Sequence, residues 1–318
     1  MGRLLVRHSR AFSLTKKARE IASILGGILL GPNDNIIVDY PAVALYVLTA
    51  NNLDLGLVAS TYFQARRNIF YAIAEGRPKL HWLAREMLDN SIVIAPSEYS
   101  ASKISEAGIH VERVIHFAVT PPKVDYDYAI SLRQKFQGKK LVVWVGANMY
   151  RKGVDLIEDA AETLGNDYAV YVVTGPGDYN INDIKAKNVH VDDRVFRLPE
   201  DKLGALYYAA DALLMTTRNE GFGLPSIEAT LIGTPAVIPE HPVLQEVLGD
   251  CGFFYEVRRV RIEDFFGLMD MEYYEPDIST LPEAMERALR EGVLTRCISV
   301  LSKRFGPDNY KAFLRYLI

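Results

Sequence analysis

The chain has 318 residues, of which 49 % are hydrophobic and 24 % are charged. That length suits two α/β domains, and that composition is typical of a soluble globular protein. The formal net charge of −4 argues against general nucleic-acid binding, which usually needs a basic domain. The two cysteines form no CxxC pair and the six histidines show no ligand spacing, so we expect neither a metal ion nor a cofactor.

In the first half, short apolar runs alternate with helix-length segments, which indicates βαβ units and a mainly parallel sheet. We expect the helix at Glu98–Ala107 to start at Ser97, an N-cap residue, and to end at Gly108. The expected strands are Leu4–Val6, Ile36–Asp39, Leu55–Ser60, Ile92–Ala95 and Arg113–His116. The other expected helices are Thr15–Leu25, Ala42–Thr49 and Phe63–Ala74.

The two prolines of Thr120–Lys123 interrupt this pattern, and we place the domain linker between residues 119 and 138. The apolar run Leu141–Gly146 then reads as a strand buried on both faces. The next strands are expected at Val170–Thr174, Arg194–Phe196, Ala212–Thr216 and Ala236–Ile238. The helices are expected at Val154–Leu164, Lys202–Ala209, Pro225–Ile232, Val243–Leu248, Leu281–Glu291 and Asp308–Leu317, with an irregular loop or insertion at Arg258–Asp277.

Six cations in the first twenty residues face a single carboxylate, Glu20. They precede the apolar stretch Ile21–Leu30, which suggests peripheral contact with an anionic membrane; a solvated or acceptor-facing edge is the alternative. No apolar run reaches the ~18 residues of a spanning helix and no cleavage site follows, so we expect a cytoplasmic protein with Cys251 and Cys297 as buried free thiols. The six cations are Arg3, Arg7, Arg10, Lys16, Lys17 and Arg19.

The segment Asn219–Ala229 follows an expected strand and opens an expected helix at Pro225, where proline costs no hydrogen bond. Gly221 and Gly223 allow the backbone to approach a ligand closely, and the amides at the helix start suit a phosphate. Ligands bind at the carboxyl ends of strands in open α/β sheets. Glu220 and Glu228 flank the turn, and carboxylates there are good acceptors for sugar and ribose hydroxyls. A tight turn with a carboxylate complementing the helix dipole is the simpler alternative.

A second strand-to-helix loop follows Gly146 and opens on the same edge of the sheet. Lys152 or Arg151 could reach a diphosphate from it and stabilise charge on a leaving group, although a solvated surface pair would read the same way. A third loop, Thr174–Asp178, adds flexible backbone at that edge through Gly175 and Gly177, or is a plain turn.

These loops, in this order, resemble the GT-B glycosyltransferases of family 4. The resemblance covers about residues 141–250, with a weaker match from Ile92–Ser100 through Gly108 to Ile115. It implies two Rossmann-like domains with a cleft between them and a C-terminal helix that crosses back to the first. The domains implied are residues 1–125 on the acceptor side and 126–305 on the nucleotide-sugar side, with 306–318 as the crossing helix.

The resemblance also implies roles for individual residues. Glu220 would bind the donor sugar and Lys152 its diphosphate, as catalytic residues, and Glu228 would bind the ribose. The backbone at Phe222, Gly223 and Leu224 would hold phosphate and sugar oxygens. Members of the family generally retain anomeric configuration and need no metal. The expected partners are a nucleotide sugar and a glycan, lipid or protein acceptor.

The sequence departs from the family in three places. Ala147 stands where an arginine usually follows the strand glycine. Arg7–Phe12 replaces a glycine-rich loop, and Ala59–Phe63 has no cleft histidine. The residues that could compensate are His8, Tyr62, Arg66 and His81. A non-catalytic nucleotide-sugar binder and another GT-B enzyme, such as a nucleotide-sugar epimerase or a phosphorylase, therefore remain alternatives to a glycosyltransferase.

Overall fold

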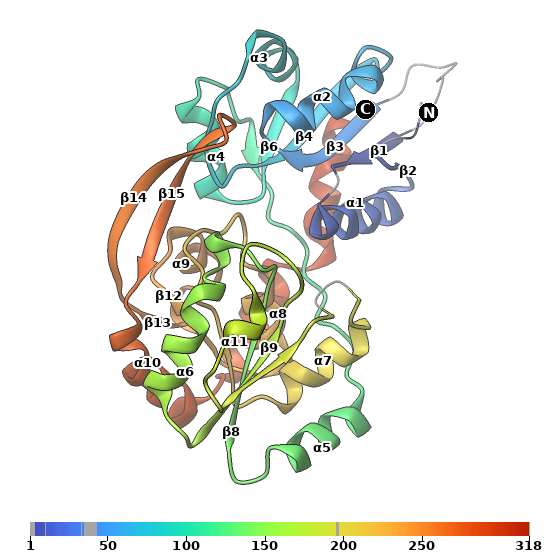
Figure 1. Cartoon of the computed structure of the whole chain (residues 1–318). Helices are drawn as coiled ribbons and strands as arrows, with labels where there is room; N and C mark the ends of the chain where they lie inside the picture. The colour runs from blue at the N-terminus through green and yellow to red at the C-terminus, as the bar shows by residue number, and fades with distance from the viewer. Residues whose placement is uncertain (1–3, 10, 33, 35–42, 195–196, 318) are drawn as a thin grey trace. The chain divides into compact units, whose positions relative to one another are not determined.

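The computed structural model describes residues 4–9, 11–32, 34, 43–194 and 197–317, and its chain forms two compact units (Figure 1). Unit 1 consists of Met1–Ala118, Ile262–Glu272 and Arg304–Ile318, and unit 2 consists of Val119–Arg261 and Tyr273–Lys303. In the described residues, each unit is built around its own six-stranded sheet. The chain therefore passes from one unit to the other four times.

The sheet of unit 1 has the order β2-β1-β3-β4-β6-β7, and its described pairings are all parallel. Parallel neighbours need crossover connections, and helices supply them here. The strands are β1 (Leu4–His8), β2 (Ile28–Leu30), β3 (Val43–Thr49), β4 (Arg67–Ile73), β6 (Ile92–Ala95) and β7 (Arg113–Val114). The helices are α1 (Phe12–Leu25), α2 (Asn52–Tyr62), α3 (Trp82–Asp89) and α4 (Glu98–Glu106).

Helices cover both faces of this sheet. On one face, Tyr46 and Phe70 of the central strands pack in a buried cluster with residues of α2, α3 and α4. On the other face, the ring of Tyr71 lies 5.0 Å from those of Phe117 and Phe313. Phe313 belongs to a 3-10 helix, η6 (Pro307–Tyr316), where the sequence predicted a helix at Asp308–Leu317. This C-terminal segment is part of the core of unit 1.

Three predicted elements of unit 1 are wrong. The predicted helices Ala42–Thr49 and Phe63–Ala74 are largely the strands β3 and β4, and the predicted strand Leu55–Ser60 lies within α2. Both strands are buried on both faces, so their apolar runs lack the alternation that separates a strand from a helix. The predicted strand Ile36–Asp39 lies outside the described residues. The helix after Ser97 is confirmed, because the Ser97 side chain accepts a bond from Ser100 N–H.

The sheet of unit 2 has the order β10-β9-β8-β11-β12-β13 and is also parallel. Its strands are β8 (Lys140–Val145), β9 (Tyr168–Val173), β10 (Val189–Asp192), β11 (Ala212–Leu214), β12 (Ala236–Pro239) and β13 (Phe253–Tyr255). Its helices are α5 (Tyr126–Lys135), α6 (Ile157–Leu164), α7 (Glu200–Ala209), α8 (Leu224–Ile232), α9 (Pro242–Leu248), α10 (Leu281–Glu291) and α11 (Thr295–Arg304).

The predicted elements of unit 2 agree with the structure better than those of unit 1. Four strands and most helices agree within a few residues, because glycines and prolines mark their ends. The strand predicted at Arg194–Phe196 is instead β10, a few residues earlier, and residues 195 and 196 lie outside the described part. The predicted linker 119–138 contains α5, which begins where the Asp125 side chain accepts a bond of 2.9 Å from Tyr128 N–H.

The prediction of two free thiols is wrong. Cys251 and Cys297 form a disulfide, with Cα atoms 5.6 Å apart. The two residues are 46 positions apart in sequence, but the turn after α9 and the start of α11 meet in the fold. Structural disulfides persist mainly in oxidising environments, so the cysteines no longer support the expectation of a reducing compartment.

The predicted irregular segment Arg258–Asp277 is a β-hairpin of β14 (Val257–Phe265) and β15 (Met269–Pro276). Its outer part belongs to unit 1, where β15 pairs antiparallel with β5 (Gly76–Pro78). A Cβ on Gly76 would lie 2.3 Å from the carbonyl oxygen of Asp270, so glycine is needed for this approach. The base of the hairpin, from Tyr273 on β15 and up to Arg261 on β14, belongs to unit 2.

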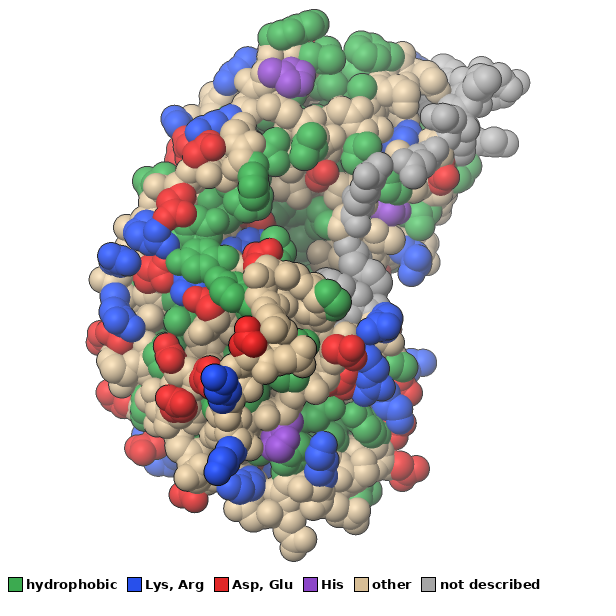
Figure 2. Space-filling view, viewed as in Figure 1, with side chains coloured by type: hydrophobic (Ala, Val, Ile, Leu, Met, Phe, Trp, Pro, Cys, Tyr) green, Lys and Arg blue, Asp and Glu red, His purple; other side chains and the backbone are tan. Residues whose placement is uncertain are grey.

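The N-terminal cations are only partly at the surface. Arg7 is 2 % exposed and donates to the oxygens of Thr61 and Pro32, and Lys17 is 1 % exposed and donates to Ala118 O and Glu20. Neither faces solvent as a membrane contact requires, whereas Arg19 is exposed. Figure 2 shows cations and carboxylates interspersed over the face in view. No described helix is long and apolar enough to cross a bilayer.

Candidate functional site

The carboxyl edge of the unit 2 sheet brings the three predicted loops together. After β8, the Asn148 side-chain amide donates to Gly175 O at 3.0 Å and Tyr179 O at 2.7 Å. A Cβ on Gly177 would lie 2.0 Å from Asn148 O, so the third loop can pack there only with glycine. A Cβ on Gly146 would likewise lie 2.7 Å from the ring of Trp144. Asn148, which the sequence analysis did not single out, thus joins the first loop to the third.

The first loop is also joined to the loop after β11, largely through backbone atoms. Gly153 has a φ of +70°, and a Cβ there would lie 1.9 Å from Thr216 O. Thr216 Oγ1 donates to Gly153 O at 2.7 Å, and Arg218 N–H donates to Arg151 O at 2.8 Å. This close approach carries Lys152 to Glu220.

The two predicted catalytic residues form an ion pair, with 2.6 Å between Lys152 Nζ and Glu220 Oε1. Glu220 is 4 % exposed, and the Lys152 side chain is 18 % exposed. Burial disfavours the charged carboxylate, but the charges of Lys152 and Arg151 outweigh it, so the pKa of Glu220 lies below its ordinary value. Glu220 is therefore a carboxylate at neutral pH, and a strong acceptor for hydroxyl groups.

The loop after Glu220 leads into α8. Gly223 adopts a φ of +77° at the N-cap, next to the side chain of Leu244, and Pro225 lies in the first turn. Gly221 and Phe222 are buried, and Leu224 is the first helical residue. Backbone N–H groups at a helix start favour an anion. The predicted phosphate-binding amides thus lie directly after the residue that pairs with Lys152.

Glu228 lies just beyond the first turn of α8. It is 8 % exposed, and the hydroxyl of Tyr207 donates to Glu228 Oε2 at 3.5 Å. Burial and the neighbouring charge of Glu228 raise the pKa of Tyr207 well above its ordinary value. Glu228 therefore faces a neutral hydroxyl, while Glu220 faces a cation.

Sequence reasoning missed two buried residues beside Glu220. Arg218 is 3 % exposed, and His241 is fully buried at the start of α9, where its Nδ1 accepts from Val243 N–H at 3.2 Å. His241 is close enough to Glu220 to affect its pKa. The sequence did offer one signal for Arg218, because it is a charged residue among the small residues that follow β11.

The residues of unit 1 that were weighed as substitutes for the missing histidine have local roles. Nδ1 of His81 caps α3, and Nδ1 of His8 contacts Ser9 O and Thr15 Oγ1. Tyr62 packs edge-on against Phe63. Arg66 is exposed. Among the described residues, no group of three or more His, Cys, Asp and Glu side chains could hold a metal ion.

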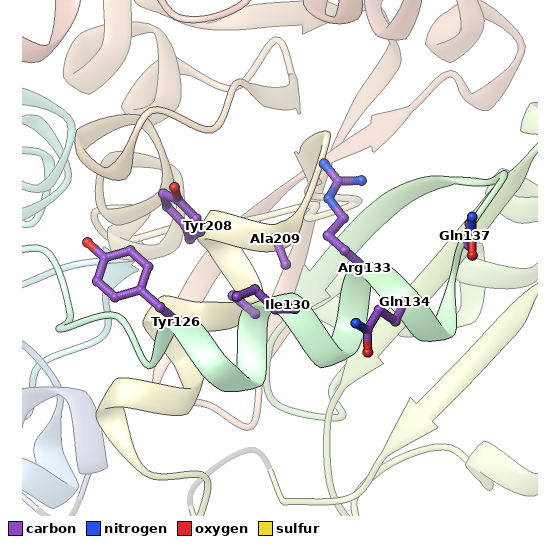
Figure 3. Close-up of a pocket in the computed structure, with 8 residues that line it drawn as sticks. Tyr126, Ile130, Arg133, Gln134, Gln137, Tyr208 and Ala209 are labelled. Atoms are coloured by element: carbon purple, nitrogen blue, oxygen red, sulfur yellow. The ribbon is translucent and has the colours of Figure 1, made fainter.

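A separate cavity of about 450 Å³ lies between α5 and α7 (Figure 3). The rings of Tyr126 and Tyr208 meet edge to face at one end, with Ile130, Arg133 and Gln134 along α5. None of the predicted site residues lines it.

The architecture is that of the GT-B fold: two Rossmann-like units with parallel sheets. Anabaena HepE in complex with UDP-glucose is similar over 99 % of both chains, with a TM-score of 0.74 and 15 % identity. The Escherichia coli trehalose-6-phosphate structure bound with UDP-2-fluoro glucose is similar over 99 % of both chains, with a TM-score of 0.72 and 11 % identity. At these identities the likeness shows the fold alone.

Residues 131–262 match the family model described as glycosyl transferases group 1, which confirms the resemblance for this part of the chain. Alpha-monoglucosyldiacylglycerol synthase of Streptococcus pneumoniae is 28 % identical over 214 residues, which are 61 % of this chain and 48 % of the relative. The O-antigen chain mannosyltransferase RfbU of Salmonella typhimurium is 30 % identical over 119 residues, 36 % of this chain and 34 % of the relative. The chain thus matches about half or less of the length of these curated relatives.

Proposed function

We propose that the protein is a retaining glycosyltransferase that moves a sugar from a nucleotide-diphosphate sugar to an acceptor hydroxyl without a metal ion. The observation that carries the proposal is the Lys152–Glu220 ion pair beside the amides of α8. A cation and a helix start can neutralise a diphosphate, and the carboxylate can accept sugar hydroxyls. The named relatives are glycosyltransferases, which supports the assignment.

In this proposal the donor exchanges partners with the ion pair. Lys152 moves from Glu220 to the diphosphate, and the donor-sugar hydroxyls take its place as donors to Glu220. The bond between the anomeric carbon and the phosphate oxygen breaks, and its electron pair leaves with the diphosphate. The acceptor oxygen bonds to the same face of the sugar and passes its proton to the departing phosphate.

The residues of the site act on the leaving group and on the ribose. Lys152 and the α8 amides then stabilise the charge that develops on the leaving group, with support from the backbone of the Gly146 and Gly175–Gly177 loops and from Arg151. Glu228 binds the ribose.

The experiment that tests the function is a thermal-shift panel of UDP-, GDP- and ADP-sugars, followed by a transfer assay with the donor that binds. Binding to the folded state raises the unfolding temperature with ligand concentration. UDP-glucose is the first probe, since the solved structures similar in fold contain UDP-glucose or its fluoro analogue. We expect α-linked product by NMR from an α-linked donor, and full activity in EDTA.

Ala147 in place of the usual arginine favours one competing function, a non-catalytic nucleotide-sugar binder. That reading predicts a thermal shift with a donor but neither hydrolysis nor transfer with any acceptor tested. An epimerase would instead release an isomerised sugar still attached to its nucleotide. Product analysis separates the three outcomes.

For the acceptor, a lipid with peripheral membrane contact stays a prediction, as does a cytoplasmic location. The relative named a glucosyldiacylglycerol synthase supports a lipid acceptor. Because Arg7 and Lys17 are buried, contact would rest on Lys16 and Arg19 among the described cations. Co-sedimentation that rises with the anionic lipid content of vesicles, and falls in the double variant Lys16→Ala, Arg19→Ala, is expected. Binding that ignores anionic lipid would dismiss the contact.

A further inference from the structure

A buried arginine connects the hairpin base to the loop that carries Glu220. The guanidinium of Arg218 donates from Nε to Glu275 Oε2 at 2.7 Å, and from Nη1 and Nη2 to the two oxygens of Asp155 at 2.7 and 2.8 Å. Nη1 also donates to Tyr150 O at 2.9 Å. One side chain thus holds together β15, the turn just before α6 and the loop after β8.

Backbone hydrogen bonds extend this connection on both sides of Arg218. Tyr274 N–H on β15 donates to Arg218 O at 2.8 Å, and Arg218 N–H donates to Arg151 O at 2.8 Å. Lys152 directly follows Arg151, and Glu220 lies two residues after Arg218. Both members of the ion pair are therefore attached to backbone that Arg218 holds in place.

The charges around Arg218 are balanced within the cluster. Burial disfavours its cation, but the hydrogen bonds that Arg218 donates to Asp155 and Glu275 outweigh burial and raise the pKa of Arg218 above its ordinary value. Arg261 of β14 donates to Glu275 Oε1 at 2.6 Å and to the Tyr150 hydroxyl at 2.8 Å. Since the donors of Arg218 are directed at these carboxylates, its charge is not aimed at a diphosphate. Arg218 therefore does not replace the arginine absent at Ala147.

The same part of β15 also contacts the residue at the start of α9. The ring of Tyr274 lies 4.6 Å from that of His241, edge to face, and His241 is close enough to Glu220 to affect its pKa. The hairpin base is thus connected to the site through Arg218 and through His241.

We propose that Arg218 and Glu275 are positioning residues for sugar transfer: through them, the hairpin base holds Lys152 and Glu220 at the separation that donor activation needs. This inference rests on the proposed function, because positioning is defined here by the transfer reaction. A misplacement of about 1 Å costs roughly a hundredfold in rate in well-studied enzymes. The signature of lost positioning is a fall in kcat larger than any rise in KM.

The test compares Glu275→Gln with Asp211→Asn in the full chain. Each substitution removes the charge of one carboxylate that accepts hydrogen bonds from arginine in unit 2. Asp211 accepts two bonds from Arg133, of 2.7 and 2.9 Å, away from the Lys152 and Glu220 loops. The first readout is amide hydrogen exchange of peptides covering residues 148–153 and 216–222, which needs no ligand. The second is the kcat and KM for release of UDP from UDP-glucose.

We expect Glu275→Gln to speed exchange of both peptides and to lower kcat at least about tenfold, while Asp211→Asn leaves both readouts near wild type. Arg218→Lys, which keeps the charge but loses the fork, should give the same result. If the amide hydrogen exchange rates and the kcat of Glu275→Gln equal those of Asp211→Asn, the positioning role is overturned. If the wild-type protein turns over none of the donors, the proposed function fails, and the role in transfer fails with it, while the exchange result still reports whether the hairpin base orders the loops.

Discussion

The described parts of the two sheets share the same parallel arrangement, but the cations of the two units are held differently. In unit 1, Arg7 donates to a hydroxyl and a carbonyl, and the buried Lys17 of α1 donates to Ala118 O and Glu20. In unit 2, Lys152 and Glu220 pair across two loops, with Lys152 partly exposed. A cation that is fully buried among groups of its own unit supports the fold, whereas a partly exposed cation at a loop edge can exchange its partner for a ligand.

Replacing the two lysines tests this contrast most strongly. Lys152→Met should lower transfer from the donor at least about tenfold, because each 1.4 kcal/mol of lost transition-state stabilisation is tenfold in rate. Lys17→Met should lower the unfolding temperature and leave the donor-induced thermal shift intact. The measurements are initial rates and thermal shifts with UDP-glucose. Glu220→Gln should also lose at least about tenfold in rate, and near-normal rates in both unit 2 variants would remove the mechanism.

The pH dependence of stability tests the Glu220 side of the ion pair. Because the pKa of Glu220 is lowered in the fold, its ionised form stabilises the protein above the ordinary carboxyl pKa. That contribution is lost as the pH falls through the lowered value. The difference in unfolding free energy between wild type and Glu220→Gln should therefore shrink on acidification. A difference that stays constant with pH would show that the ion pair contributes nothing.

The backbone of the Lys152 loop gives the next prediction. Gly153→Ala introduces a Cβ against Thr216 O at a φ of +70°, whereas Gly26→Ala, in the same left-handed conformation at the end of α1, meets nothing within 4 Å at a φ of +68°. Left-handed strain alone costs about 1–2 kcal/mol, which is what Gly26→Ala should show in denaturant unfolding. Gly153→Ala should cost a further 1–3 kcal/mol or so by overpacking and reduce donor binding. Equal costs would mean that the two loops do not depend on their close contact.

The disulfide gives the smallest expected effect on the site. Reduction, or the double variant Cys251→Ala, Cys297→Ala, should lower the unfolding free energy by about 2–4 kcal/mol, since the bridge closes a long loop. Donor affinity should stay close to wild type, because the bridge joins the turn after α9 to α11. The check is thermal unfolding with and without reductant, and an unchanged midpoint would show that the bridge does not form in solution.

The sequence predicted unit 2 and the pairing loops well because those segments combine several local signals. A buried strand, a glycine with a required conformation and a proline in the first turn of a helix all mark the same boundary near Gly223 and Pro225. Unit 1 offers fewer such markers. The runs that form β3 and β4 are apolar throughout, and one strand mistaken for a helix shifted the assignment of the segments after it.

The residues around the ion pair could not be predicted for a different reason. Arg218 and Glu275 are 57 positions apart, and their hydrogen bond depends on a hairpin that the sequence did not reveal. The strand β14 reads Val-Arg-Arg-Val-Arg-Ile-Glu-Asp-Phe, with many exposed charges in place of regular alternation. Its pairing with β15 and the contact of β15 with Gly76 are long-range, so no local propensity reports them.

The position of the hairpin bears on how this chain can be cut or recombined. The segment shared with the glycosyl transferases group 1 ends at residue 262, within β14, so an excised or grafted piece with those limits would leave Glu275 and Tyr274 behind. Arg218 would then keep Asp155 and lose its second carboxylate. A piece of this protein meant to keep the Lys152 and Glu220 loops intact should therefore extend through Pro276, beyond the border that family similarity suggests.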